Sequence, residues 1–342
     1  MTVSDQHLPA RAAGPARERR PAPGRRPGRG RLAMCAATIA ACVPYLFLKI
    51  LWLSGSTVGW NDTESAGESA RYVGNVVTLG MDAVAVLVVL AFTFPWGRRI
   101  PAWLVLAPIW TATGLLLPIA LGVPLGTVVQ TLTSSTPITG DDNGLQGWVY
   151  AIVYGGFTLQ GIGLLAAFTL YARDRWADVF TQRVGETPAG ATHHVQRLLT
   201  HVMVAPVLLY AGVRLFWAFG GTSGLPDGEA GERNAAQQTI EGVYGLLALV
   251  GIAGLLALVN RRGGRFWKPM VAAWVGAGAL FTRSLYTLTL QLGASDVFDA
   301  ESSPLAGLSM LVGLIAGLVM ALTGAFLLAE RRPGAGRTAP SL

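Results

Sequence analysis

Five ionisable side chains lie inside long apolar stretches of the 342-residue sequence. They are Lys49, Asp82, Arg214, Glu241 and Arg283. A charge at the centre of a bilayer costs about 2.5–3.5 kcal/mol on insertion scales, so each of these residues needs a partner, water or a functional reason. These three bases and two acids are therefore the candidates for a binding site or for internal ion pairs.

Lys49 and Arg214 occupy equivalent surroundings. Each follows a tyrosine by four residues and precedes a tryptophan by three, so the three side chains share one face of a helix. Near the end of an apolar run, such a cation could extend towards lipid headgroups, with the tryptophan at the interface. It could instead pair with a carboxylate, Lys49 with Asp82 and Arg214 with Glu241, or contact a ligand directly. The sequence leaves these alternatives open.

Arg283 lies deeper, about nine residues from the end of its apolar run. Its neighbours carry hydroxyl groups: Thr282, Ser284, Tyr286, Thr287 and Thr289. Arg283 could pair with Glu241 or Asp82, or it could help to bind an anion from the outer side. The corresponding apolar run of the first half, at 102–123, contains no charged residue.

The sequence contains no motif typical of a metal, hydrolase or nucleotide site. The four histidines, at 7, 193, 194 and 201, avoid the middle of the apolar runs, and no carboxylate or cysteine completes a metal site. Motifs of zinc proteases, serine hydrolases and P-loop nucleotide sites are absent. Cys35 and Cys42 lie about 10 Å apart on one helical face, too far for a disulfide. We expect no catalytic residue, metal or cofactor.

The stretch around Lys49 recurs around Arg214, with 165 positions between matched residues. Both copies read Tyr-x3-(Lys/Arg)-x2-Trp-x2-Gly-x-Thr-x-Gly. The matched residues are Tyr45, Lys49, Trp52, Gly55, Thr57 and Gly59 in the first copy, and Tyr210, Arg214, Trp217, Gly220, Thr222 and Gly224 in the second. The glycines follow an apolar helix, which predicts C-terminal caps where glycine supplies a positive φ.

The second copy of this stretch, at 217–224, resembles a turn in a group of uncharacterised bacterial integral membrane proteins. Those proteins look like four-helix units that carry a Trp-Ala-x-Gly-Gly-x-x-Gly turn. The first copy, at 52–59, departs from the pattern at Ser54 and Ser56. The Arg-, Ala- and Gly-rich style is similar to membrane proteins of high-GC Gram-positive bacteria. The resemblance implies a bacterial membrane protein and carries no activity.

The elements that must position these residues are membrane-spanning helices. The sequence is 52% hydrophobic and only 13% charged, whereas soluble domains have about 25% charged residues. Eight apolar segments are each long enough to cross a hydrocarbon core of about 30 Å. They lie at 33–54, 73–95, 102–123, 148–172, 197–219, 239–260, 269–292 and 305–329. We expect an all-α polytopic membrane protein with eight transmembrane helices.

The charges between these segments predict the orientation. Basic residues concentrate in the N-terminal tail, in 96–101, 173–196 and 261–268, and after the last segment, whereas the other loops are acidic and hold two bases, Arg71 and Arg233. The positive-inside rule therefore places both termini in the cytoplasm. Together with this orientation, the resemblance to bacterial membrane proteins implies the inner membrane of a bacterial cell. This one-sided distribution also accounts for the net charge of +7 without a nucleic-acid partner.

The predicted organisation is a duplicated four-helix unit. It consists of a disordered Arg/Pro-rich tail at 1–32, a first repeat at 33–172, a cytoplasmic linker at 173–196, a second repeat at 197–330 and a tail at 331–342. Because four is even, both copies enter from the same side and form parallel repeats about an axis along the membrane normal.

Duplication and intramembrane charges favour a protein that binds or transports a small solute through a site in the outer half, between the repeats. Two alternatives remain. In one, the chain is a structural or accessory subunit of a membrane complex, and its charges only pair internally. In the other, it is an intramembrane enzyme acting on lipid, which the missing nucleophile and metal patterns disfavour. The expected partners are the bilayer and an unidentified solute or membrane protein.

Overall fold

The computed structural model describes residues 28–61, 68–133, 145–186, 190–225, 233–293 and 303–331. These residues are helical and contain no β-strand, which confirms the predicted all-α class. The long helices are α1 (Arg29–Leu53), α2 (Glu68–Thr93), α3 (Ala102–Thr133), α4 (Gly147–Arg175), α6 (His193–Ala218), α7 (Ala235–Val259), α8 (Trp267–Gly293) and α9 (Pro304–Glu330). Shorter helical turns are η1 (Pro95–Arg99), α5 (Ala177–Thr181) and η2 (Val184–Glu186). Of the tail predicted to be disordered at 1–32, residues 1–27 lie outside the described residues, as do most of the acidic loops, whereas Arg29–Leu32 form the first turn of α1, so the prediction was wrong there.

Seven of these helices are long and apolar enough to cross a membrane, which makes the chain a multi-pass membrane protein. They are α1, the Arg71–Thr93 part of α2, α3, α4, α6, α7 and α9. Within the described residues, α8 is the remaining long helix; Lys268, Arg283 and the hydroxyl residues near Arg283 make it less apolar.

Several predicted boundaries differ from the structure: α2 begins at Glu68 instead of 73, α6 at His193 instead of 197, and α7 at Ala235 instead of 239. Helix α1 begins at Arg29, four positions before the predicted start at 33, with Gly28 at its N-cap. Helix α3 continues to Thr133, although the predicted segment ended at 123, directly before Pro124. Proline removes one backbone hydrogen bond, and packing against neighbouring membrane helices makes that loss tolerable.

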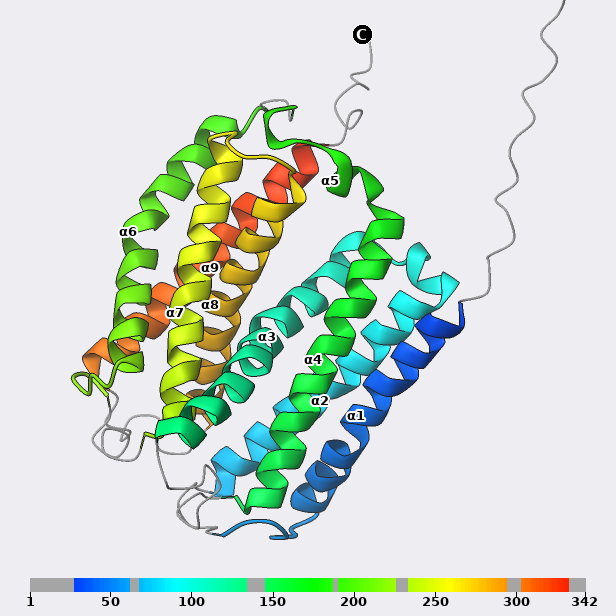
Figure 1. The fold of residues 1–342 in the computed structure, drawn as a ribbon, viewed down its shortest axis with the longest axis vertical. Coiled ribbons are helices and arrows are strands. Elements are labelled where there is room, and N and C mark those ends of the chain that lie inside the picture. The colour runs from blue at the N-terminus through cyan, green and yellow to red at the C-terminus, as the bar shows by residue number, and fades with distance from the viewer. Residues whose placement is uncertain are drawn as a thin grey trace, which may run out of the picture.

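The long helices form two adjoining groups, α1–α4 and α6–α9, as Figure 1 shows. In the first group, α4 packs against α1, α2 and α3; in the second, α9 packs against α6 and α8. Helix α3 lies at the junction and packs against α7 and α8 of the other group. The core of the first group includes Ile109 and Leu164, and that of the second includes Val207, Leu255 and Leu280.

Glycine allows close contact at the junction. A methyl group on Gly114 of α3 would lie 2.3 Å from the carbonyl oxygen of Gly278 on α8, so only glycine fits there. Beside this contact, the indole N–H of Trp110 donates to the carbonyl of Trp274 at 3.0 Å. Small residues let backbones approach where no hydrophobic effect drives helix association in lipid. The two groups are therefore held by direct backbone packing.

The motif glycines form the predicted caps. Positive φ angles occur at Gly55 (92°), Gly59 (83°), Gly220 (89°) and Gly224 (80°). This left-handed conformation is open to glycine and strained for other residues. The caps end α1 and α6 in the same way, which confirms this prediction.

The motif tryptophans fold back over these turns. The indole N–H of Trp52 donates to the carbonyl of Val58 at 2.8 Å, and that of Trp217 donates to the carbonyl of Ser223 at 3.1 Å. Each bond spans six positions, and its donor and acceptor in the first copy lie 165 positions before those in the second copy. The matched sequence pattern thus produces a matched hydrogen bond.

Each turn packs against the first residues of the last helix of its group. A methyl group on Gly59 would lie 2.2 Å from Val149 Cγ2 of α4, and one on Gly224 would lie 2.5 Å from Leu305 Cδ2 of α9. The close contact fixes where α4 and α9 begin.

The 173–196 segment is more structured than a simple linker. It contains α5 and η2, and Val184 within it is buried in the core of the second group. At its end, Glu330 of α9 accepts hydrogen bonds from the amide and hydroxyl of Thr192 and from Gln196 at 2.8–2.9 Å. This carboxylate satisfies the backbone amide of Thr192, the N-cap residue of α6, which has no partner within the helix.

Candidate functional site

Lys49 and Asp82 form a buried ion pair between α1 and α2. Lys49 Nζ lies 2.6 Å from Asp82 Oδ2, and the two side chains are 0% and 4% exposed. Gln160 of α4 donates to the other carboxylate oxygen at 3.2 Å, and Lys49 Nζ lies 3.8 Å from the ring centre of Tyr45. Of the alternatives open at the sequence level, the structure has the ion pair and not the extension towards headgroups.

The direction of helical side chains explains this result. Side chains of an α-helix lean towards its N-terminus. Lys49 lies in the last turns of α1 and therefore points into the bundle, away from the helix end that it is near. Asp82 belongs to the next, antiparallel helix and leans towards it. The same reasoning applies to Arg214 near the end of α6 and Glu241 on α7.

Arg214, Glu241 and Arg283 form a second buried cluster, from α6, α7 and α8. Arg214 Nη1 lies 2.7 Å from Glu241 Oε2, and Arg283 Nη2 lies 3.5 Å from Glu241 Oε1. Arg214 also lies over the rings of Tyr210 and Trp217, at 4.9 and 5.2 Å from their centres. Two cations thus share one carboxylate, which leaves one positive charge without a matching negative charge.

The two arginines differ in how firmly they are held. The side chain of Arg214 is 9% exposed, whereas that of Arg283 is 35% exposed and makes the longer contact with Glu241. The guanidinium carbon of Arg283 also lies 5.4 Å from the ring centre of Tyr244. Arg283 is therefore the more available cation of the pair.

Tyrosines connect the two charged clusters across the junction. Tyr154 of α4 and Tyr286 of α8 lie within electrostatic range of Arg283, and both lie within electrostatic range of Tyr45, which packs against Lys49. Polar side chains therefore continue from the Lys49–Asp82 pair to the Arg283 cluster. The solute site expected between the repeats stays a prediction.

Several buried donors near the second cluster lack a hydrogen-bond partner. Among the described residues they include Arg214 Nε, Arg283 Nε and Ser284 Oγ. All three belong to the second group, and each carries an N–H or O–H. Buried polar groups are nearly always paired, so these donors are candidates for contacts to water or to a ligand. With the unmatched positive charge, they suit a group that is negatively charged and accepts hydrogen bonds.

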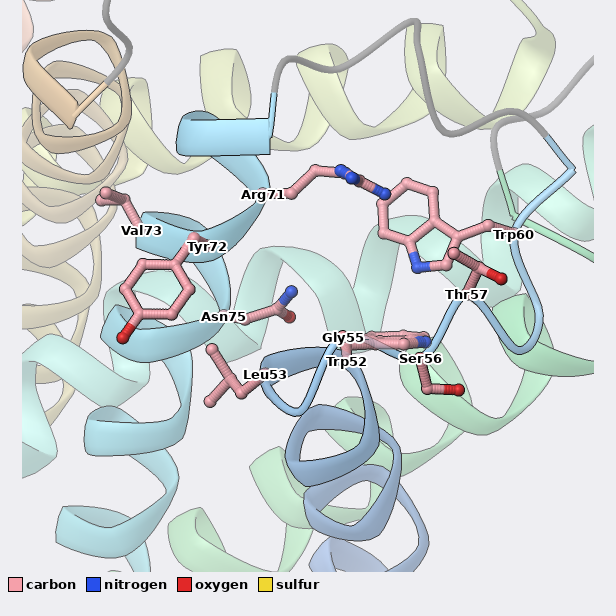
Figure 2. Close-up of a pocket in the computed structure, with 10 residues that line it drawn as sticks. All are labelled: Trp52, Leu53, Gly55, Ser56, Thr57, Trp60, Arg71, Tyr72, Val73 and Asn75. Atoms are coloured by element: carbon pink, nitrogen blue, oxygen red, sulfur yellow. The ribbon is translucent and has the colours of Figure 1, made fainter.

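A separate cleft of about 460 Å³ lies at the predicted outer end of the first group (Figure 2). Its walls are Trp52, Leu53, Gly55, Ser56, Thr57, Trp60, Arg71, Tyr72, Val73 and Asn75. Trp52, Gly55 and Thr57 belong to the repeated motif, whereas no sequence pattern joins Arg71, Trp60 and Asn75 to it. The weak signal was that Arg71 is a base among acidic residues on the predicted outer side.

No metal centre is formed by the residues that the structure describes, since no three His, Cys, Asp or Glu side chains gather in one place there. Cys35 and Cys42 are buried free thiols.

Comparisons with protein-family models, curated proteins and solved structures find no match to this chain. The functional reading of the two sites therefore rests on their geometry.

Proposed function

We propose that the chain is a bacterial inner-membrane protein that binds a small anionic solute from the outer side, at the Arg283 cluster. Its eight long helices would all span the membrane as two parallel four-helix repeats, with both terminal segments in the cytoplasm. The observation that carries the proposal is the single carboxylate of Glu241 shared by Arg214 and Arg283.

Helix α8 is counted as a span because of its length and neighbours. Its 27 residues extend about 40 Å at 1.5 Å per residue, more than the hydrocarbon thickness of about 30 Å. It packs against α7 and α9 and also reaches α2 and α3, so its polar face is covered by protein. An intramembrane charge that faces the interior of a bundle is the usual arrangement.

The repeat is supported by matched geometry as well as by matched residues. Both copies place a cation over a tyrosine ring, end the helix at a left-handed glycine and fold a tryptophan back onto the turn. The halves differ in their acids: position 247, which corresponds to Asp82, is leucine, and position 76, which corresponds to Glu241, is valine. The first half thus holds a neutral pair, whereas the second holds the surplus charge.

The location supports access from the outer side. Arg283 lies ten residues before the end of α8, and Arg214 lies four residues before the end of α6. Towards the other end, the second group is filled by the apolar side chains of Leu255, Leu258 and Phe266. Binding therefore needs only the outer half, whereas transport would also require the two groups to move relative to each other.

A fluorescence-monitored thermal unfolding series tests this proposal. Purified protein in a non-ionic detergent, with gluconate as background anion, is titrated with sulfate, phosphate, acetate and succinate. We expect at least one anion to raise the Tm of the wild type, because a ligand that binds only the folded state stabilises it. The increase should be lost in Arg283→Gln and kept in Arg98→Gln, which removes an exposed arginine that pairs with Asp174 far from the cluster. No anion-dependent difference between wild type and Arg283→Gln would overturn the proposal.

A second candidate function is that of an accessory subunit with no site of its own. The observation that favours it is the Lys49–Asp82 pair, which is fully buried, satisfied by Gln160 and in need of no ligand. If the Arg283 cluster is also purely structural, removing charge from Arg283 should destabilise the protein without changing any anion response. The same titration therefore separates the two functions.

A further inference from the structure

The cleft at the end of α1 contains Arg71, which makes no salt bridge with any carboxylate in the described part of the chain. The guanidinium carbon of Arg71 lies 5.2 Å from the ring centre of Trp60, and its Nε is buried with no hydrogen-bond partner. Figure 2 shows Arg71 and Asn75 on successive turns of α2, on the side of the helix that faces the turn. Within the described residues, no Asp or Glu forms a salt bridge with Arg71. None of the described acids therefore neutralises Arg71.

The aromatic wall of the cleft is fixed in place. The rings of Trp52 and Trp60 meet edge to face at 5.7 Å between centres, and the indole N–H of Trp52 is bonded to the carbonyl of Val58. The backbone around Trp60 is held by a bridge to Leu145 at the start of α4. A preorganised wall loses little entropy when a ligand is bound.

Neutral donors complete the lining. Asn75 contributes an amide, and Thr57 and Ser56 contribute hydroxyl groups. Arginine matches the geometry of a phosphate with its planar fork, and amides and hydroxyls commonly add single hydrogen bonds. A volume of about 460 Å³ lies within the range of pockets for small ligands.

The second copy of the motif shows that the turn does not require this lining. Gly221 stands where Ser56 is found, and the ring of Phe216 occupies the adjacent space, 2.4 Å from where a methyl group on Gly221 would be. Leu225 stands where Trp60 is found. The same helix cap forms in both halves, so the cap does not depend on the polar and aromatic side chains of the first half.

We propose that this cleft binds a phosphate group, carried either by an anionic lipid headgroup or by a soluble phosphate ester. Arg71 would hold the phosphate oxygens, Asn75 and Thr57 would donate to them, and the two indoles would pack against the attached glycerol or sugar. Tyr72, which also lines the cleft, is 59% exposed, so the cleft opens to the surface of the molecule. This site shares no residue with the Arg283 cluster and does not depend on the proposed solute binding.

Isothermal titration calorimetry on the purified full chain in a non-ionic detergent tests the proposal. The probes are dihexanoyl phosphatidylglycerol, glycerol 1-phosphate and, as the zwitterionic control, dihexanoyl phosphatidylcholine. We expect phosphatidylglycerol to bind, and its affinity to fall about tenfold or more in Arg71→Gln, because a charge-assisted hydrogen bond is lost. Arg233→Gln, which removes the other arginine on the predicted outer side, should bind like the wild type.

The other outcomes are equally decisive. Binding of glycerol 1-phosphate with the same dependence on Arg71 would support the site and identify a soluble ester as its ligand. If Arg71→Gln does not fold, Arg71→Lys keeps the charge but loses the planar fork, and we expect it to bind several-fold more weakly. Equal losses in the Arg71 and Arg233 variants, or no binding of any phosphate probe by the wild type, would overturn the proposal.

Discussion

The ammonium group of Lys49 lies 2.6 Å from the carboxylate of Asp82, and neither side chain is exposed by more than 4%. A buried pair of this kind resists the loss of one partner more than the loss of both, because the remaining charge is left uncompensated. The pair joins α1 to α2 at the point where α4 also contributes Gln160. It is therefore a structural connection among three helices of the first group.

We expect Lys49→Met to lower the free energy of unfolding by about 3–5 kcal/mol, and Asp82→Leu to have a similar effect. The double variant should recover most of the loss, because no unpaired charge remains. Equilibrium unfolding of the detergent-solubilised protein measures all three. A double variant no more stable than the single ones would show that the two charges are not coupled.

Replacing Arg214 should lower the free energy of unfolding more than replacing Arg283. Arg214 makes the shorter, more buried contact with Glu241, so Arg214→Gln should cost about 3–5 kcal/mol. Arg283→Gln leaves the Arg214–Glu241 pair intact and should cost about 1 kcal/mol or less, since its side chain is partly exposed. Unfolding of both variants under the same conditions checks this order. The reverse order would make Arg283 the structural residue.

The turns of the two copies should respond alike to substitution. Gly55 and Gly220 have positive φ and no atom within 4 Å of an added methyl group, so alanine should cost about 1–2 kcal/mol at either site through the backbone alone. Gly212 lies in a helix with equal space and an ordinary φ, and Gly212→Ala should stabilise the protein by about 0.5–1 kcal/mol. Thermal unfolding of the three variants tests this. Unequal losses at Gly55 and Gly220 would argue against equivalent turns.

Cysteine labelling should report the orientation. Thr222 is exposed in the turn after α6, and Glu186 is exposed in the segment before it. In intact cells, a membrane-impermeant maleimide should label Thr222→Cys and should reach Glu186→Cys only after the membrane is broken. The native Cys35 and Cys42 are buried and give little background. Labelling of Glu186→Cys in intact cells would invert the predicted topology.

Local features of the fold could be predicted from the sequence. The caps at Gly55 and Gly220 depend on a few adjacent residues, and an apolar helix followed by glycine has few other conformations. The extension of α3 past Pro124 could not be predicted in this way, because neighbouring helices make the lost hydrogen bond tolerable. The direction of Lys49 was predictable in principle from helix geometry.

The site was predictable only as a set of residues. The five buried charges were visible because charge is rare in apolar runs, but Glu241 as a shared partner depends on how α6, α7 and α8 pack. Arg71 and Asn75 could hardly be identified as cleft residues from the sequence. Their position near Trp60 depends on tertiary packing, in which the carbonyl of Gly59 accepts a hydrogen bond from the amide of Gln146 at the start of α4. Such contacts between distant segments are set by tertiary packing.

The most direct test of solute binding at the Arg283 cluster is equilibrium binding of the most stabilising anion to wild-type, Arg283→Lys and Arg283→Gln protein. We expect Arg283→Lys to retain part of the affinity and Arg283→Gln to lose about tenfold or more, since the surplus positive charge disappears. Equal affinities for the wild type and Arg283→Gln would contradict the account, because the anion would then bind elsewhere.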